Sequence, residues 1–364
     1  MKYLVYITLS YNEYKNKIFG QLKAWKNKGY EPVVFSIDSS DSNYQLLRIE
    51  SSMDIKEIIF SASTKRQVFD YMGQYVQNNF DNQDNIIYIR RLGISLLYFG
   101  KYIKHYISKV LYEIPTYPID TSISFLKWLS GGIEFLYFKY FVYPYVTAVP
   151  IFLQSKKGRM LEKFIPIHNS VEVIEQNVIS KKNIGEDFAF IFIGNVQAWH
   201  GLDKFLDCFV SSNSNNSVLV FSSNTLVYVK LKEKYKYFSN IIFAGKVEIS
   251  ELSHLLQRYS NVIGIGGLNY ESRGAELDTS LKNKDYAALG IPFIYKLEDE
   301  SFINYRYGLQ LKDVDFSHDL IDKITTWYRL IHHEKMSADI VEFAKNHLSY
   351  EEQIDRIIRK IQDK

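Results

Sequence analysis

Two segments of the chain carry residue types that suit an anionic ligand. In the first, an apolar run over residues 188–193 ends at Gly194, and after a short loop His200 opens a run with apolar residues on one side. This order predicts a strand, a glycine-containing turn and an amphipathic helix. A helix that starts above a strand presents unpaired backbone N–H groups and the positive end of its dipole to whatever lies there. The segment therefore indicates a site for an anion such as phosphate.

The second segment covers residues 276–294. It indicates a charged loop, a helix that stops at Gly290 and a buried strand. Acidic and basic side chains alternate near the predicted helix start, among them Lys282 and Asp285. Together with the first segment, this one suggests a site for an anionic nucleotide ligand.

Composition restricts the class of protein. With 364 residues the chain is long enough for two domains, and an apolar fraction of 46% is too high for a disordered chain. The formal net charge of +3 gives no reason to expect nucleic acid as a partner. The N-terminus begins directly with a predicted strand and lacks the features of a signal peptide, so we expect a cytoplasmic protein.

Strands and helices alternate along the sequence. Strands are predicted at residues 2–8, 32–37, 85–90, 109–113, 146–150, 164–167, 188–193, 217–221, 240–244, 262–265 and 293–295. Helices are predicted at residues 13–27, 65–78, 92–105, 125–141, 156–161, 202–210, 226–235, 250–259, 281–289, 317–334, 338–346 and 350–362.

Continuous apolar strands divided by helices indicate parallel sheets that helices cover on both faces. We therefore expect an α/β fold with two Rossmann-like, doubly wound domains that face a cleft, over residues 1–170 and 171–346. The C-terminal helix, residues 347–364, is expected to pack back on the first domain.

Five short segments resemble one family in their order and spacing. They are residues 17–24 (KIFGQLKA), 111–118 (LYEIPTYP), 167–171 (IHNSV), 194–203 with its WHGLD ending, and 280–292 (SLKNKDYAALGIP). Most of the chain thereby resembles the GT-B glycosyltransferases, in particular the family 4 (group 1) enzymes that build bacterial capsule, exopolysaccharide and O-antigen. The resemblance implies a metal-independent hexosyltransferase of the retaining type, which needs no cofactor. Its donor would be a nucleoside-diphosphate sugar, and its acceptor a growing, polyprenyl-linked glycan.

The resemblance also implies roles for individual residues. The family commonly uses two glutamates at a fixed spacing, of which the second binds the ribose. Asp285 stands at the second position, while Glu276 lies one residue before the first position and Asp278 one residue after it. The alternative is that Asp285 and Lys282 are solvated helix residues. The expected donor-binding residues are Gly194, Asn195, His200, Gly266, Gly267, Arg273, Asp278, Ser280, Leu281, Lys282 and Asp285.

The expected phosphate contacts depart from the family pattern. Many relatives have an arginine and a lysine in the glycine-rich turn, where this chain has Asn195 and His200. More of the phosphate binding is therefore expected from backbone N–H groups after Gly194 or at Gly266 and Gly267, and from Lys282, with Lys284 or Arg273 as alternates. A histidine at a helix start is expected to be a neutral donor, because the helix dipole disfavours its protonated form. A purely capping or packing role for His200 is the alternative.

In the first domain, Glu113 follows an apolar strand and precedes a rigid loop with two prolines. A carboxylate among apolar neighbours is expected to have a raised pKa and could act as a general base. The alternative is a hydrogen-bonding role that braces the loop at residues 114–118. Glu113 and Glu276 are the catalytic candidates, and Tyr11, Asn12, Lys17 and Tyr117 are expected on the acceptor side.

Two weaker signals remain. A metal site at Asp38 and Asp41 is less favoured than a polar loop after a strand. The aromatic-rich segment 125–145 could rest on a membrane surface, at the inner face of the cell membrane, or be buried in the first domain.

Two other functions also stay open: a GT-B nucleotide-sugar epimerase, and a binding or scaffold subunit without catalysis.

Overall fold

The structure is a computed structural model in two compact units. Unit 1 comprises Met1–Leu153, Lys157–His168 and Tyr350–Lys364, and unit 2 comprises Gln154–Lys156 and Asn169–Ser349. The residues that it describes are 1–9, 11, 14–40, 43–49, 56–117, 125–153, 155, 160–174, 187–212, 214–256, 258–273, 276–278, 280–312, 316–317 and 319–362.

Unit 1 contains an eight-stranded sheet in the order β4-β3-β2-β1-β5-β6-β7-β8. Its strands are β1 (Lys2–Thr8), β2 (Tyr30–Ser40), β3 (Asn43–Ile49), β4 (Lys56–Ala62), β5 (Ile86–Arg90), β6 (Lys109–Tyr117), β7 (Val149–Leu153) and β8 (Phe164–Ile167). Six neighbouring strands run parallel, in the order β2, β1, β5, β6, β7 and β8. At the other edge, β3 pairs antiparallel with both β2 and β4.

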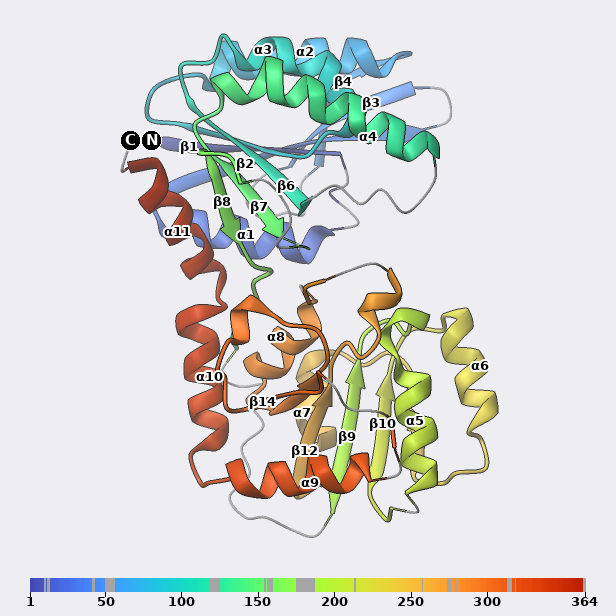
Figure 1. The fold of residues 1–364 in the computed structure, drawn as a ribbon. Coiled ribbons are helices and arrows are strands. Elements are labelled where there is room, and N and C mark those ends of the chain that lie inside the picture. Colours follow the sequence, from blue (N-terminus) through green and yellow to red (C-terminus); the bar gives the residue numbers. More distant parts are fainter. Residues whose placement is uncertain are drawn as a thin grey trace. The chain divides into compact units, whose positions relative to one another are not determined.

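Helices cover both faces of this sheet (Figure 1). One face packs on α2 (Lys65–Phe80), on α3 (Leu96–Ile103) and on the end of a third helical segment. This segment consists of α4 (Phe125–Tyr137), the π-helical turn η3 (Phe138–Val142) and η4 (Tyr143–Tyr145). The other face packs on α1 (Lys15–Asn27) and α11 (Tyr350–Gln362), so the first and last helices of the chain share one core.

The two antiparallel strands correct the prediction of a purely parallel sheet. Strand β2 runs on to Ser40 and is paired with β3, so the polar stretch from Asp38 belongs to a strand and was wrongly predicted as a loop. Asp41 lies outside the described residues. Strand β3 is buried on part of its length only, as antiparallel edge strands can be, and therefore lacks the continuous apolar run of a buried parallel strand.

Unit 2 contains a six-stranded parallel sheet in the order β11-β10-β9-β12-β13-β14. Its strands are β9 (Phe188–Ile193), β10 (Ser217–Phe221), β11 (Ile241–Phe243), β12 (Asn261–Ile265), β13 (Phe293–Tyr295) and β14 (Gly308–Gln310). The helices are α5 (Leu202–Ser211), α6 (Leu226–Lys234), α7 (Ile249–Leu256), α8 (Leu281–Ala288), α9 (Leu320–Ile331) and α10 (Met336–His347).

This strand order is that of a doubly wound nucleotide-binding sheet. The order reverses between β9 and β12, and ligands of such sheets bind beyond the carboxyl ends of the strands at this reversal. The predicted α/β fold class is thus confirmed in both units, and the very short strand β14 was missed.

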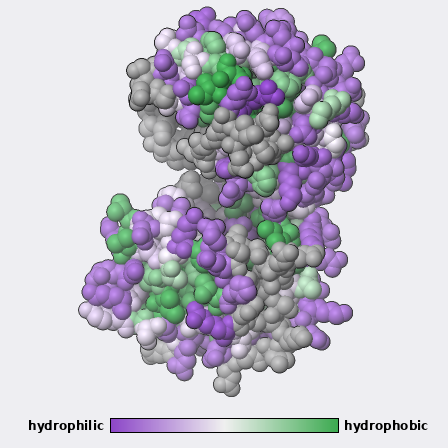
Figure 2. Space-filling view, turned by 180° about the vertical axis from the view of Figure 1, so that it is seen from behind, coloured by the Kyte–Doolittle hydropathy of each residue, from purple (hydrophilic) through white to green (hydrophobic). Residues whose placement is uncertain are grey.

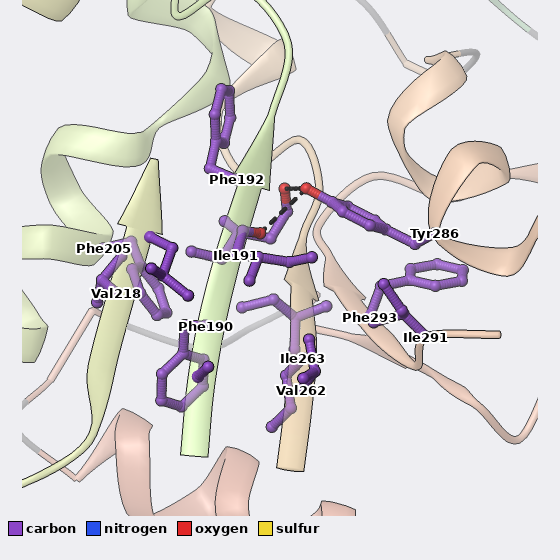
Figure 3. Packing of buried hydrophobic residues seen from close by; sticks show 14 of the residues in the cluster. Phe190, Ile191, Phe192, Phe205, Val218, Val262, Ile263, Tyr286, Ile291 and Phe293 are labelled. Atoms are coloured by element: carbon purple, nitrogen blue, oxygen red, sulfur yellow. Dashed lines mark hydrogen bonds between the residues drawn. The ribbon is translucent and has the colours of Figure 1, made fainter. Parts of the chain in front are cut away.

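A buried tyrosine holds α8 against β9 and β12 (Figure 3). The hydroxyl of Tyr286 lies 3.1 Å from the carbonyl oxygen of Ile191 and 2.9 Å from that of Ile265, and it accepts a hydrogen bond from the N–H of Ile193 at 3.2 Å. Gly264 makes room for the ring, since a Cβ there would lie 2.5 Å from it. The helix start is therefore held beside the carboxyl ends of both strands.

Where residues are described, the face seen in Figure 2 is mainly hydrophilic. Figure 2 shows one face of each unit, on which hydrophobic residues form separate groups among hydrophilic ones. Within the part of the chain that the structure describes, no helix has both the length and the apolar character to cross a membrane.

Candidate functional site

The turn after β9 is the first part of the candidate site. Gly194 has a φ of +103°, a conformation that side chains disfavour, and its N–H donates to the carbonyl of Phe221 at 2.9 Å. The N–H of Val196 donates to the hydroxyl of Ser222 at 3.0 Å. Among the described residues of this turn, Asn195 is left with an N–H that makes no hydrogen bond, and the residue is exposed.

The glycines after β12 serve close packing. The N–H of Gly266 donates to the carbonyl of Ile294 at 2.8 Å. A Cβ on Gly266 would overlap the amide of Asn283, and one on Gly267 would overlap the ring of Tyr270. Both glycines are buried, so their absent side chains let the turn lie directly against α8 and its neighbours.

His200 and Lys282 come together although they are distant in sequence. The Nδ1 atom of His200 accepts a hydrogen bond from the N–H of Gln197 at 3.1 Å, and its Nε2 lies 3.1 Å from Nζ of Lys282. Since Nδ1 is an acceptor, the neutral ring carries its proton on Nε2, facing the lysine. The histidine thus caps its own short helix, η6 (Ala198–His200), with one ring nitrogen and meets Lys282 with the other.

Burial shifts the pKa of Lys282. The loss of solvation lowers the pKa of its amine to about 8, although the carboxylates of Asp285 and Asp278 act in the opposite direction. A Cβ on Gly194 would lie 3.7 Å from the same amine, so the lysine nitrogen lies at the turn after β9. An anion bound at this turn would be within reach of both the lysine and the histidine.

Asp285 lies one helical turn after Lys282. It is partly buried, and none of the described residues is within hydrogen-bonding or ion-pairing distance of its carboxylate. Burial raises the pKa of Asp285 to about 7, against the opposing charges of Lys282 and Lys284. A half-buried carboxylate without partners is suited to accept hydrogen bonds from a ligand hydroxyl group.

The buried face of α8 carries polar residues. Leu281, an expected donor-binding residue, is 40% exposed, whereas the polar residues Asn283 and Lys284 are fully buried. Lys284 forms an ion pair of 2.8 Å with Asp299, and only 1% of each of these two side chains is exposed. The proposed alternate role of Lys284 at the phosphate is therefore not compatible with its position.

Asp278 holds the start of α8 in place through hydrogen bonds. It is buried, and its carboxylate accepts hydrogen bonds from the N–H of Ser280 at 2.8 Å and from the amide of Asn283 at 3.0 Å. Burial and the nearby Asp299 raise the pKa of Asp278 to about 6. Ser280 is the N-cap residue of α8, and its buried hydroxyl makes no hydrogen bond with the described residues.

The two remaining donor-side candidates precede α8. Glu276 is exposed and accepts a hydrogen bond of 2.5 Å from the hydroxyl of Ser155. Arg273 is the last residue of the short helix η7 (Tyr270–Arg273). In the part of the chain that is described, no three His, Cys, Asp or Glu side chains form a group that could hold a metal ion.

In unit 1, Glu113 is the centre of a buried polar cluster. Its carboxylate lies 2.5 Å from Nη1 of Arg90 and 4.0 Å from Nζ of Lys17. It also accepts hydrogen bonds from the hydroxyl of Tyr88 at 2.7 Å and from the amide of Gln21 at 3.2 Å. Glu113 itself is fully buried.

The expected rise in the pKa of Glu113 is wrong. Burial alone would raise it, but Arg90 and Lys17 together with the two hydrogen bonds outweigh burial and lower the pKa of the carboxyl below its ordinary value. The main partner is on the neighbouring strand and not in the proline-containing loop, because Arg90 and Glu113 are paired in register across β5 and β6.

The cluster extends to the C-terminal helix. Gln21 accepts a hydrogen bond from the hydroxyl of Tyr6 at 3.0 Å and donates one to the side chain of Gln353 in α11 at 3.1 Å. Gln353 in turn donates to the carbonyl of His168 at 2.6 Å. Strands β1, β5 and β6, helices α1 and α11 and the residue after β8 thus share one hydrogen-bonded network.

The structure brings together only part of the predicted acceptor side. Lys17 is nearly buried, its amine lies 3.7 Å from the centre of the Phe152 ring, and burial lowers its pKa to about 7. Tyr11 is buried in the same core as α1. Tyr117 is buried in the core on the opposite face of the sheet, in edge contact with Phe164, and Asn12 lies outside the described residues.

Comparison with solved structures identifies the fold. A glycosyltransferase from Rickettsia africae ESF-5 matches with a TM-score of 0.70 at 12% identity, over 100% of this chain and 98% of that one. The chain has the GT-B fold of glycosyltransferases. Anabaena Alr3699/HepE, in complex with UDP and glucose, matches with a TM-score of 0.61 at 10% identity over all of both chains.

A third structure with this GT-B architecture is the apo form of the lipopolysaccharide outer core galactosyltransferase WaaB. It matches with a TM-score of 0.60 at 11% identity, over 99% of this chain and 100% of that one. No protein-family model matches the chain, and no curated protein is similar to it in sequence.

Several residues around the candidate site residues were missed from the sequence. Arg90, Tyr88 and Gln21 contact Glu113 and lower its pKa, Gln353 bonds Gln21, and Asp299 pairs with Lys284. The one local signal was Arg90, a charged residue at the end of an otherwise apolar strand. The other partners become apparent only through the three-dimensional packing.

Proposed function

We propose that the protein is a hexosyltransferase that moves a sugar from a nucleoside diphosphate to a growing bacterial surface glycan. The observation that carries this proposal is the grouping of Lys282, His200 and Asp285 at the reversal of strand order in unit 2. The side chains of Lys282 and His200 can donate hydrogen bonds to phosphates, and the carboxylate of Asp285 can accept them from hydroxyl groups. A ligand that has both phosphates and hydroxyl groups suits this combination.

Each of these groups has a distinct part in the proposed donor site. Lys282 and the Nε2–H of His200 bind the diphosphate, and the N–H of Asn195 adds a backbone donor. Asp285 accepts hydrogen bonds from the ribose hydroxyls. Other proteins with this fold support such a ligand, since HepE was solved with UDP and glucose and a plant starch synthase IV with ADP and acarbose.

The same groups supply the proposed chemistry. When the bond between sugar and phosphate breaks, negative charge develops on the departing diphosphate, and fixed donors next to it stabilise that charge. In this proposal Lys282 and His200 do so without a metal ion or other cofactor. Retention of the anomeric configuration is the expected outcome, with Glu276, near the start of α8, as the candidate carboxylate at the sugar.

We further propose a lipid-linked acceptor that unit 1 binds at the inner face of the cell membrane. The fold likeness to WaaB, a galactosyltransferase of the lipopolysaccharide outer core, supports an acceptor of this kind. The partly buried Lys17 and the buried Tyr11 are the proposed contacts on this side.

A panel of nucleotide sugars tests the function by thermal shift and by product analysis. A ligand that binds only the folded protein raises its melting temperature. We expect a shift with one nucleotide sugar and its nucleoside diphosphate, and glycoside formation when a lipid-linked glycan is added. The absence of a shift with every nucleotide contradicts the proposal and favours a scaffold, whereas donor turnover without any acceptor favours an epimerase.

A further inference from the structure

The part of the helical segment formed by α4 and η3 exposes a continuous apolar stripe. Leu129, Ile133, Leu136 and Tyr140 are spaced by four, three and four residues, which places them on one side of a helix. Between 44% and 61% of each of these side chains is exposed, and 61% of Phe141 is exposed next to Tyr140.

The stripe is not needed for the core of unit 1. The opposite side of the same segment already packs on the sheet through Phe138 and Val142, which are buried. Glu134 also points inward, where it pairs with Arg91 at 2.7 Å. The wide π-helical turn η3 lies between these buried anchors, and both Tyr140 and Phe141 remain outside.

Helix α3 extends the apolar surface. It packs closely on α4, because Gly100 has no side chain and a Cβ there would lie 2.7 Å from Tyr137. On α3 and the turn before it, η2 (Gly93–Ser95), Ile94, Leu97 and Tyr98 are exposed. We call these three residues together with Leu129, Ile133, Leu136, Tyr140 and Phe141 the apolar face.

The charges around the apolar face are basic. Lys101 of α3 and Lys104, the residue after its end, are exposed, and Lys139 lies beside Tyr140. Glu134 is the one acidic residue among residues 93–105 and 129–145, and it is buried. Asp70 of α2 pairs with Lys101 at 2.6 Å, which leaves Lys104 and Lys139 to give the surface a positive charge.

We propose that the apolar face rests on a lipid bilayer that contains anionic lipids. Apolar side chains flanked by lysines and tyrosines are the composition of helices that lie in the plane of a membrane interface. A second copy of the chain fits less well, because two such faces would bring lysines together without acidic residues to oppose them.

This surface complements the proposed function, because it would bring the enzyme to a lipid-linked acceptor. Vesicle binding does not depend on nucleotide or on the donor site in unit 2. A failure of the membrane proposal and a failure of the proposed glycosyltransferase activity are therefore distinguishable.

Co-sedimentation with vesicles tests the proposal. The vesicles consist of phosphatidylcholine alone or with phosphatidylglycerol. We expect the full chain to bind the mixed vesicles, more weakly at high salt. The combined variant Leu136→Ser, Tyr140→Ser and Phe141→Ser should lose at least about tenfold in affinity for them, because it removes the most exposed apolar groups of the face.

A matched control comes from unit 2. Leu226, Tyr237 and Leu330 are 79% to 85% exposed, so the variant Leu226→Ser, Tyr237→Ser and Leu330→Ser removes similar groups from another surface and should bind vesicles like the unchanged chain. The variant Lys104→Glu and Lys139→Glu provides a second test that leaves every apolar side chain in place, and it should lose affinity for anionic vesicles only.

Three results would overturn the proposal. The first is the absence of binding to mixed vesicles, and the second is equal binding by the apolar-face variant and the control. The third is a dimer of the unchanged chain, seen in sedimentation equilibrium, that the apolar-face variant dissociates. That result would assign the face to a second copy of the chain.

Discussion

Nζ of Lys282 and Nε2 of His200 lie 3.1 Å apart at the carboxyl end of the unit 2 sheet. Each can donate a hydrogen bond to an oxygen atom, and the hydrogen bond from the N–H of Gln197 to Nδ1 keeps the ring in the orientation that makes this possible. An anion between or above the two nitrogens would accept from both. This pair is the most specific feature of the candidate donor site.

Lys282→Ala should weaken the binding of nucleoside diphosphate about ten- to a hundredfold, the equivalent of about 1.5–3 kcal/mol for a hydrogen bond to a charged group. Binding of the bare nucleoside should change much less, since only the phosphates meet the amine. Calorimetric titration of both ligands measures the difference. An equal loss for both would mean that the lysine has a structural role.

The pH dependence of diphosphate binding should report on the same amine. Its pKa of about 8 in the free protein means that Lys282 is charged below this pH and neutral above it. A nucleoside diphosphate should bind more tightly than the bare nucleoside, and this difference in affinity should decrease between pH 7 and pH 9. The decrease corresponds to the loss of the single positive charge of Lys282. Lys282→Ala should show a flat profile, and a persistent decrease in that variant would assign the titration to another group.

Lys284→Met should act on stability. The substitution leaves the carboxylate of Asp299 buried without its lysine partner. Breaking a buried ion pair in this way lowers the free energy of unfolding by about 3–5 kcal/mol. Urea denaturation monitored on unit 2 measures this loss. Lys282→Met is the matched control, because its lysine is on the same helix but has no carboxylate partner within ion-pairing distance among the described residues, and its stability should change little.

Asp285→Asn should weaken donor binding by about 1.5–3 kcal/mol through the loss of a charged acceptor. It should also raise the melting temperature at pH 8. The pKa of Asp285 is raised to about 7 in the folded protein from an ordinary value of 3.8, so the folded state is favoured when this group is protonated. That stability is fully present below about pH 4 and is lost as the pH rises through about 7.

Scans of Asp285→Asn and the unchanged chain at pH 5 and pH 8 test the sign. The variant should melt higher at pH 8, with a smaller difference at pH 5. A variant that binds donor normally would remove Asp285 from the site.

Glu113→Gln should destabilise unit 1 by about 3–5 kcal/mol, because it leaves the guanidinium of Arg90 buried without a charged partner. Since the pKa of Glu113 is lowered, its contribution is present above its ordinary value of 4.5 and is lost as the pH falls through the folded-state value. Denaturation at neutral and acidic pH measures both. Glu134→Gln is the control, because its partner Arg91 is 24% exposed and water can replace the lost carboxylate.

The same variant tests catalysis. A carboxylate with a lowered pKa is a weak base at neutral pH, so we expect turnover per folded molecule to remain near normal. A loss of at least about 100-fold with unchanged donor affinity would show instead that Glu113 acts as a base.

The strands and helices with continuous local patterns were predictable. The apolar run of β9 and the Gly290 stop after α8 are properties of neighbouring residues, and both were placed well from the sequence. The end of β6 was not. A strand over residues 109–113 was predicted, but β6 continues through Pro115 to Tyr117. Its pairing with β7 shifts register between Ile114 and Tyr117, so the sheet accommodates a residue without an N–H.

The charge states in the candidate site were beyond sequence reasoning. Glu113 was expected to have a raised pKa from its apolar neighbours in the chain, whereas Arg90 across the sheet reverses the shift. Lys284 and Lys282 are alike in sequence context, yet one faces Asp299 in the core and the other meets His200. Such differences depend on contacts between residues that are far apart in the chain.

The place of α11 in unit 1 has a consequence for how the protein folds during synthesis. Tyr350, Ile354 and Ile357 fill the core between α11 and the sheet of unit 1, and Gln353 completes the network that reaches Glu113. Ribosomes make proteins from the N-terminus, and domains made first generally fold first. Unit 1 therefore cannot complete this core until the ribosome has also made all of unit 2, and until then the part of β1 and β5 that α11 covers stays exposed beside α1.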